Sequence, residues 1–135
     1  MAPFATLAKH RDLGLLILRV GVGVMFITHG VPKLARGVDG WERLGRTMEL
    51  VGIGFAPTLW GLLAALAETL GGLCLALGLW TRAACLPLVF TMVMAAVNHL
   101  AKGDGFGKAS HAIEACFVFA GIFFAGPGRY SFDRR

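Results

Sequence analysis

The stretch from Leu59 to Leu79 is a run of apolar residues with one carboxylate, Glu68, near its centre. Its length matches the roughly 20 residues that a helix needs to cross the hydrocarbon core of a bilayer. A charged residue at mid-membrane costs about 2.5–3.5 kcal/mol on translocon scales, and each leucine contributes about −0.3 to −0.6 kcal/mol. Because nine leucines of the stretch offset one acid, we expect a membrane-spanning helix that carries Glu68 at mid-depth.

Helical periodicity places Glu68 on a face of small residues. At about 100° per residue, one face holds Glu68 with glycines and alanines, and leucines form the opposite face. Small residues allow helices to approach closely in a membrane, whereas leucines suit lipid. Glu68 should therefore point into the protein, either as a structural polar contact or as a functional group. The small face comprises Gly61, Ala64, Ala65, Gly71 and Gly72, and the leucine face Leu59, Leu62, Leu63, Leu66, Leu70, Leu73 and Leu77.

Composition indicates a membrane protein with one domain. The chain has 135 residues, of which 56% are hydrophobic and 16% charged, too apolar for an ordinary soluble domain. The net charge of +5 comes from basic residues that flank the apolar runs, so we expect anionic lipid headgroups as partners and no nucleic acid. Three cysteines lie within apolar runs without a C-x-x-C pair and should behave as small hydrophobic residues.

Four apolar runs predict an all-α, polytopic membrane four-helix bundle over residues 1–135, with spans at about 13–33, 58–79, 83–100 and 107–125. In the first loop, Trp41, Leu44, Met48 and Val51 recur at helical spacing. This pattern predicts a short amphipathic helix that lies on the membrane or caps the bundle.

The fourth run raises a question of length. His111 to Ala125 covers only about 22 Å at 1.5 Å per residue, against a hydrocarbon core of about 30 Å. We expect the helix to begin nearer Phe106, which would bring His111 and Glu114 into the apolar zone. The alternative is a locally thinner bilayer, with Ser110 as N-cap and Glu114 as a first-turn acid.

Four antiparallel spans place both termini on one side and bring several polar residues to similar depth. We expect a polar track that leads from this level down to Glu68 and ends at an ion pair between Glu68 and Arg19. Arg19 would lie about 7 Å beyond Glu68 along the axis, within reach of a guanidinium. Counts of Lys and Arg are equal on the two sides and do not fix the orientation. The residues at the upper level are His29, Lys33, Asn98, His99, His111 and Glu114.

This set of residues allows three interpretations. Histidines and a carboxylate can ligate a metal, but no compact spacing such as H-x-x-x-H is present, and we assign no metal ligand. Groups that titrate near neutrality inside an apolar bundle suit proton transfer coupled to a lipid-soluble quinone. The third interpretation is a hydrogen-bond network that only holds the helices together.

Four short motifs follow one another along the chain. They are the segment from Arg19 to Lys33 with its His29-Gly30 pair, Ala67-Glu68-Thr-Leu-Gly71-Gly72 with Leu77-Gly78-Leu-Trp-Thr81-Arg82, the pair His111-x-x-Glu114, and Gly126-Pro127-Gly128-Arg129 through Asp133. Their order and spacing resemble those of the DoxX family of small bacterial membrane proteins, and the first of them is similar to the first-helix motif of that family.

This resemblance implies a multi-pass protein of the bacterial inner membrane with cytoplasmic termini. Members of the family are linked to quinone-dependent thiosulfate oxidation, to quinol oxidase subunits and to redox-stress complexes. The positions that match the family are Arg19, His29, Lys33, Glu68, His111 and Glu114; His99 and Asn98 are added from their depth.

We therefore expect a membrane subunit of a quinone-linked or quinol-linked oxidoreductase. In this hypothesis, Glu68, His29, His111 and Glu114 are the catalytic groups, and Arg19, Lys33, Asn98 and His99 bind the quinone. The alternative is a non-catalytic anchor or assembly partner for a soluble redox enzyme, docked through the segment around Trp41 or the basic tail. A small transporter or proton pathway would require a homo-oligomer, because four spans leave little room for alternating access.

Overall fold

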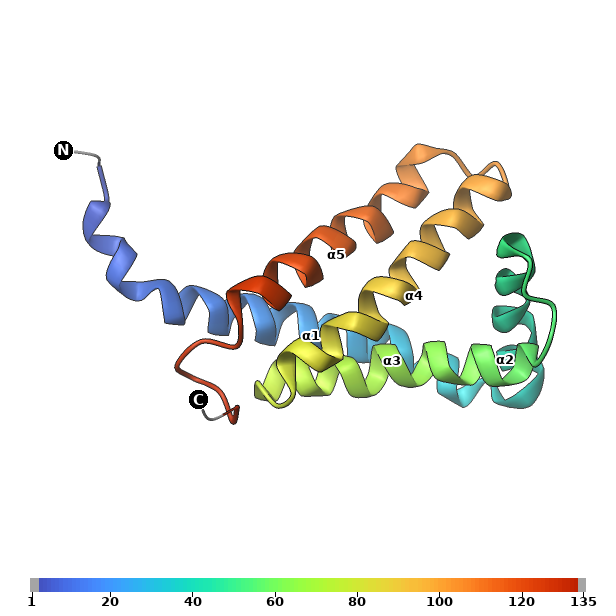
Figure 1. The fold of residues 1–135 in the computed structure, drawn as a ribbon, viewed down its shortest axis with the longest axis horizontal. Helices are drawn as coiled ribbons and strands as arrows, with labels where there is room; N and C mark the ends of the chain where they lie inside the picture. Colours follow the sequence, from blue (N-terminus) through green and yellow to red (C-terminus); the bar gives the residue numbers. More distant parts are fainter. Residues whose placement is uncertain (1–2, 134–135) are drawn as a thin grey trace.

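The computed structural model describes residues 3–133, and all regular secondary structure within them is helical (Figure 1). In this part of the chain, four helices are long and apolar enough to cross a membrane, as predicted. These are α1 (Arg11–Ala35), α3 (Pro57–Leu77), α4 (Thr81–Ala101) and α5 (Phe106–Ala125). A short 3-10 helix, η1 (Ala5–His10), precedes α1, and the first loop holds α2 (Gly37–Gly45) and a second 3-10 helix, η2 (Arg46–Val51).

The fourth membrane helix starts at Phe106, as the length argument predicts. Its 20 residues span about 30 Å at 1.5 Å per residue, which matches the hydrocarbon core without local thinning. The alternative, in which Ser110 caps a shorter helix, is wrong.

The helices form two pairs that splay apart. In Figure 1, α1 and α3 run side by side, and α4 and α5 form a hairpin that meets α3 near the start of α4 and then diverges from it. The element formed by α2 and η2 stands at the opposite end of α3 (Figure 1). This divergence leaves α3 and α4 in close contact at only one end.

Close packing of α1 on α3 depends on glycine. A Cβ atom on Gly23 would lie 2.5 Å from the carbonyl oxygen of Gly72, and one on Gly72 would lie 2.6 Å from the carbonyl oxygen of Gly23. The two backbones are therefore in contact, as small residues permit in membranes. Gly21 lies on a different face of α1, where a Cβ atom would meet no other atom within 4 Å. This glycine therefore faces outward.

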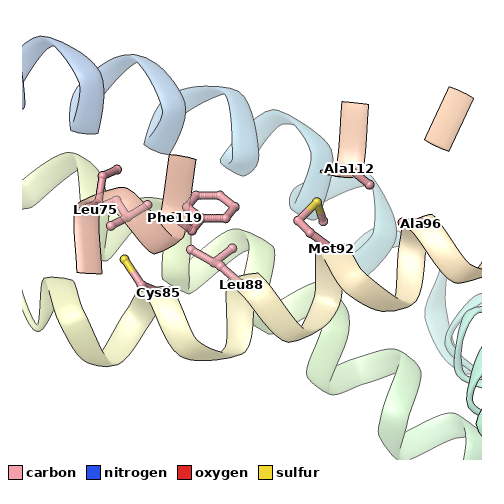
Figure 2. Close-up of a cluster of buried hydrophobic side chains, with 8 residues drawn as sticks. Leu75, Cys85, Leu88, Met92, Ala96, Ala112 and Phe119 are labelled. Carbon is pink, nitrogen blue, oxygen red and sulfur yellow. The ribbon is translucent and has the colours of Figure 1, made fainter. Parts of the chain in front are cut away.

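The predicted faces of α3 are confirmed at most positions, and Leu62, Ala64 and Leu66 are half-buried. Its buried residues include Gly61, Ala65, Gly71 and Gly72 together with Glu68, whereas Leu59, Leu63, Leu70, Leu73 and Leu77 are exposed. The apolar core lies where α3, α4 and α5 converge, and Figure 2 shows Leu75, Cys85, Leu88 and Phe119 meeting there, with Met92 farther along α4 beside Ala112. Phe26 of α1 reaches the same core through an edge-to-face contact with Phe119, with ring centroids 4.7 Å apart.

The predicted amphipathic helix of the first loop is present and caps the bundle. Trp41 donates a hydrogen bond from Nε1 to the carbonyl oxygen of Lys33 at 3.1 Å, and Met48 is buried. A Cβ on Gly61 would overlap the carbonyl oxygen of Trp41, so α2 rests directly on the α3 backbone. Val51, at the end of the predicted apolar face, is exposed.

The C-terminal segment ties α1 to the start of α4. Arg19 is fully buried and donates hydrogen bonds to the carbonyl oxygens of Leu75, at 2.9 Å, and Tyr130. Asp133 accepts hydrogen bonds from the backbone N–H groups of Trp80, at 2.6 Å, and Thr81, at 2.8 Å. Since α4 has no side-chain cap of its own at Trp80, Asp133 satisfies these helix-end donors from a distant part of the chain.

The same contacts set the ionisation of Asp133. Burial raises the pKa of this carboxyl, but hydrogen bonds from Thr81 and Trp80 and the positive charge of Arg19 outweigh burial, so the pKa lies below its ordinary value. The charged form therefore stabilises the folded protein.

Replacement of Gly23 by alanine should destabilise the protein by about 1–3 kcal/mol, the usual cost of overpacking. The matched control is Gly21→Ala on the same helix, which should be neutral or stabilising by up to about 1 kcal/mol. The measurement is the free energy of unfolding in detergent with increasing denaturant. Equal stability of the two variants would contradict backbone contact between α1 and α3.

Replacement of Asp133 by alanine should cost about 0.5–2 kcal/mol, as expected for loss of a helix N-cap. The contribution of Asp133 should be complete above its unfolded pKa of about 3.9 and should disappear as the pH falls through the lowered folded pKa. Thermal unfolding of wild type and Asp133→Asn, followed from pH 7 to pH 3, checks the sign. A destabilisation by Asp133→Asn that grows as the pH falls would refute it.

Candidate functional site

A long apolar groove lies between α3 and α4, where the two helices diverge. Its volume is about 640 Å³, and it runs along α4 from Trp80 to His99, with Gly45 and Met48 of the first loop closing part of one end. At 1.5 Å per residue, this length of helix rises about 28 Å, so the groove extends over most of the hydrocarbon thickness. Apolar side chains form most of its lining, including Leu63, Leu66, Leu70, Phe90 and Met94.

An ion pair sits in the wall of this groove. Lys33 Nζ donates hydrogen bonds to Oε1 of Glu68 at 2.7 Å and to Oε2 at 2.9 Å, and both residues line the groove. The Glu68 side chain is 1% exposed and that of Lys33 is 27% exposed. An ammonium has three N–H donors, and Glu68 accepts two of them. The third is available to another acceptor.

The glycine contacts between α1 and α3 bring the two charges together. A Cβ on Gly30 would overlap Oγ1 of Thr69, so the α1 backbone touches α3 beside Glu68. Lys33 follows Gly30 by three residues and therefore lies on the same face, one turn farther along. Its long side chain reaches back to the carboxylate. The register of the helices thus selects Lys33 as the partner of Glu68.

The predicted ion pair between Glu68 and Arg19 is wrong. With Gly23 opposite Gly72, Arg19 lies level with Leu75 rather than with Glu68. Seven residues along α3 correspond to about 10 Å, and the guanidinium is already bonded to the carbonyl oxygens of Leu75 and Tyr130. Arg19 does not line the groove; it joins α1, α3 and the C-terminal segment.

The predicted polar track is assembled only in part. Asn98 and His99 line the groove together with Lys33 and Glu68. His29 of α1 and His111 and Glu114 of α5 are exposed and lie outside the groove lining. These three residues share a depth but occupy outer faces, because depth along a helix does not fix the direction of a side chain. The expectation that they line a polar track leading down to Glu68 is therefore wrong.

His99 has a partner at the end of the groove. Its Nδ1 lies 2.9 Å from Oδ2 of Asp104, which follows α4 in the last loop. The hydrogen bond from His99 holds the pKa of Asp104 below its ordinary value. Burial opposes this shift, and the positive charges of Lys108 and Lys102 reinforce it. This pair connects the groove with the loop surface.

Sequence reasoning missed most of the groove lining. One face of α4 lines the groove with residues that recur at spacings of three or four. They are Trp80, Ala84, Pro87, Thr91, Met94 and Asn98. This periodicity identifies a face, but apolar and small residues give no sign that it borders a cavity. The sequence predicts that Lys33 binds the quinone, but it does not predict the ion pair between Lys33 and Glu68.

Comparison with known proteins gives a consistent assignment. The family model described as DoxX matches residues 14–100. An uncharacterized membrane protein of Mycobacterium tuberculosis, Rv3486, is 33% identical, with 87% of this chain and 78% of the relative covered. The inner membrane protein YqjF of Escherichia coli is 30% identical, with 93% and 94% covered.

A further relative bears a name that suggests chemistry. The putative oxidoreductase CatD of Bacillus subtilis is 29% identical, with 75% of this chain and 70% of the relative covered. No solved structure matches the chain.

Removal of Lys33 should be more damaging than removal of the Glu68 charge. Lys33→Met leaves a carboxylate that is 1% exposed without its partner, and breaking a buried pair costs about 3–5 kcal/mol. Glu68→Gln should cost less, because Lys33 is partly exposed and its ammonium can reach water. The double variant Lys33→Met/Glu68→Met should recover most of the loss. Unfolding free energies in detergent provide the measurement.

The exposed pair between Arg46 and Glu42, at 2.6 Å, serves as the control. Arg46→Gln should change stability by no more than about 1 kcal/mol. If Lys33→Met is as mild as Arg46→Gln, the Lys33–Glu68 pair is not buried as described.

Proposed function

The chain belongs to the DoxX family, and we propose that it acts as a membrane subunit of a quinone-linked oxidoreductase. The quinone headgroup would occupy the groove beside Lys33 and Glu68. The observation that carries this proposal is the ion pair in the wall of an apolar groove of about 640 Å³. The name of the Bacillus subtilis relative, a putative oxidoreductase, supports the same class of chemistry.

The groove residues fit a quinone in shape and polarity. A ligand site of this kind combines apolar walls with a few placed polar groups. Here Leu70, Phe90 and Met94 supply the apolar walls, and Lys33 and Glu68 supply one donor and one acceptor. Exposed Leu63, Leu70 and Phe90 lie along the groove, so an isoprenoid tail can enter from the lipid.

A bound quinone would supply the redox step, in which two electrons and two protons convert it to a quinol. Lys33 would donate its third N–H to a headgroup carbonyl while it holds Glu68 in place. Glu68 would accept the two quinol protons one after the other at a carboxylate oxygen, each leaving before the next is taken, or return them in the same way during reduction. His99 and Asp104, at the loop end of the groove, would exchange that proton with water. The electrons would pass to or from a partner oxidoreductase subunit.

We also propose that the protein resides in a bacterial inner membrane with its termini in the cytoplasm. Two relatives from Escherichia coli are named inner membrane proteins. The orientation rests on the family resemblance, and it would place the loop end of the groove on the outer side of that membrane.

Glu68→Gln should weaken binding of a short-chain quinone by at least about fivefold, because a hydrogen bond to a charged group contributes about 1.5–3 kcal/mol. The measurement uses full-length protein in phosphatidylcholine nanodiscs, titrated with decylubiquinone. Trp60 and Trp80 line the groove, so quenching of their fluorescence reports occupancy. The matched control is Glu114→Gln, which removes an exposed carboxylate outside the groove and should bind as wild type does.

Equal affinity of wild type and Glu68→Gln would rule out this role for the ion pair. If Glu68→Gln also leaves capture of a soluble redox enzyme from native membranes unchanged, the protein is a non-catalytic anchor instead.

A further inference from the structure

A second cavity continues the groove at its loop end. Its volume is about 480 Å³, and Leu44, Thr47 and Asn98 line both this cavity and the groove. The remaining lining residues are Gly40 and three cations, Arg36, Arg43 and Lys102. We name this cavity the basic mouth.

The three cations come from separate elements that meet at one level. Arg36 follows the last residue of α1, Arg43 belongs to α2, and Lys102 follows the last residue of α4. Helices α1 and α4 cross the membrane, so their ends lie at headgroup depth. The partial negative charge at each helix C-terminus favours cations at these positions. The stem of Arg36 rests against Gly40, where a Cβ would overlap the Arg36 Cβ.

Acidic side chains offset the charge of the basic mouth only in part, because Asp104 lies near Lys102 alone of the three cations. None of the residues that line it is acidic. Among the described neighbours, Glu42 pairs with Arg46 at 2.6 Å, and Asp104 pairs with His99 at 2.9 Å. Asp39, in the first turn of α2, is exposed. Three cations around one cavity therefore present a net positive site at the membrane surface.

We propose that the basic mouth binds the phosphate of an anionic phospholipid, with one acyl chain of that lipid lying in the adjoining groove. The phosphate oxygens accept hydrogen bonds from Arg36, Arg43 and Lys102. Arginine suits this role, because its guanidinium presents several N–H donors to a phosphate. The acyl chain passes Leu44 and lies against the apolar wall of α3 and α4. A soluble anion would use the mouth alone, whereas the apolar continuation favours a lipid.

This site uses different polar groups from the proposed quinone site, although both ligands extend into the same groove. A quinone headgroup carries no phosphate and uses Lys33 and Glu68, which do not line the basic mouth. The acyl chain of the lipid would share the groove with the quinone tail. The test of one proposal can therefore fail without overturning the other, because the two depend on different polar groups.

Native mass spectrometry of the full-length protein tests this proposal, with dioleoylphosphatidylglycerol and dioleoylphosphatidylcholine in equal amounts. We expect about a tenfold preference for phosphatidylglycerol, since each cation near anionic lipid contributes favourably. The triple variant Arg36→Gln/Arg43→Gln/Lys102→Gln should lose that preference. The matched control, Lys9→Gln/Lys108→Gln/Arg129→Gln, removes three exposed charges outside the mouth and should keep it.

Three results would overturn the proposal. One is an unchanged preference in the mouth variant, and another is an equal loss in both triple variants, which would indicate general charge attraction. The third is binding of glycerophosphoglycerol, which has no acyl chains, as tightly as the intact lipid. Glu68→Gln should keep the lipid preference, which separates this result from the quinone test. Circular dichroism of each variant confirms that the helices remain folded.

Discussion

The ion pair between Lys33 and Glu68 is the interaction on which the remaining structure depends. A carboxylate that is 1% exposed at mid-membrane is tolerated only with a partner, and the partner comes from another helix. The pair forms because Gly30 and Gly23 let α1 touch the α3 backbone. The glycines of α1 therefore set the register of the two helices, and the register sets the charge pairing. A shift of α1 by one turn would leave the carboxylate without its ammonium.

The buried charges divide into two groups with different surroundings. Arg19 is bonded to backbone carbonyl oxygens and helps to hold the C-terminal segment against the α3–α4 turn, which suits a structural role. Lys33 and Glu68 lie in the wall of a groove with a free N–H and carboxylate lone pairs beside it. The groove exists because α4 and α5 diverge from α1 and α3 (Figure 1). Lys33 and Glu68 can therefore take part in chemistry with a membrane-soluble ligand, whereas Arg19 cannot reach one.

The sequence predicts the helices and the direction of Glu68, but not its partner. Length and hydropathy are local properties, so four spans and the start of α5 at Phe106 follow from them. The small face of α3 similarly points Glu68 inward. The choice between Arg19 and Lys33 depends on how far one helix slides along another, and backbone contacts at Gly23 and Gly30 decide this. His29, His111 and Glu114 show the same limit, because a shared depth does not specify a shared direction.

Solid-state nuclear magnetic resonance in lipid bilayers measures the central contact directly. With ¹⁵N at the lysine side chains and ¹³C at the glutamate carboxyls, Lys33→Arg and Glu68→Gln spectra assign the two signals. The structure predicts strong dipolar coupling between Lys33 Nζ and the Glu68 carboxyl, as required by N–O distances of 2.7 and 2.9 Å. Absence of that coupling would contradict the account.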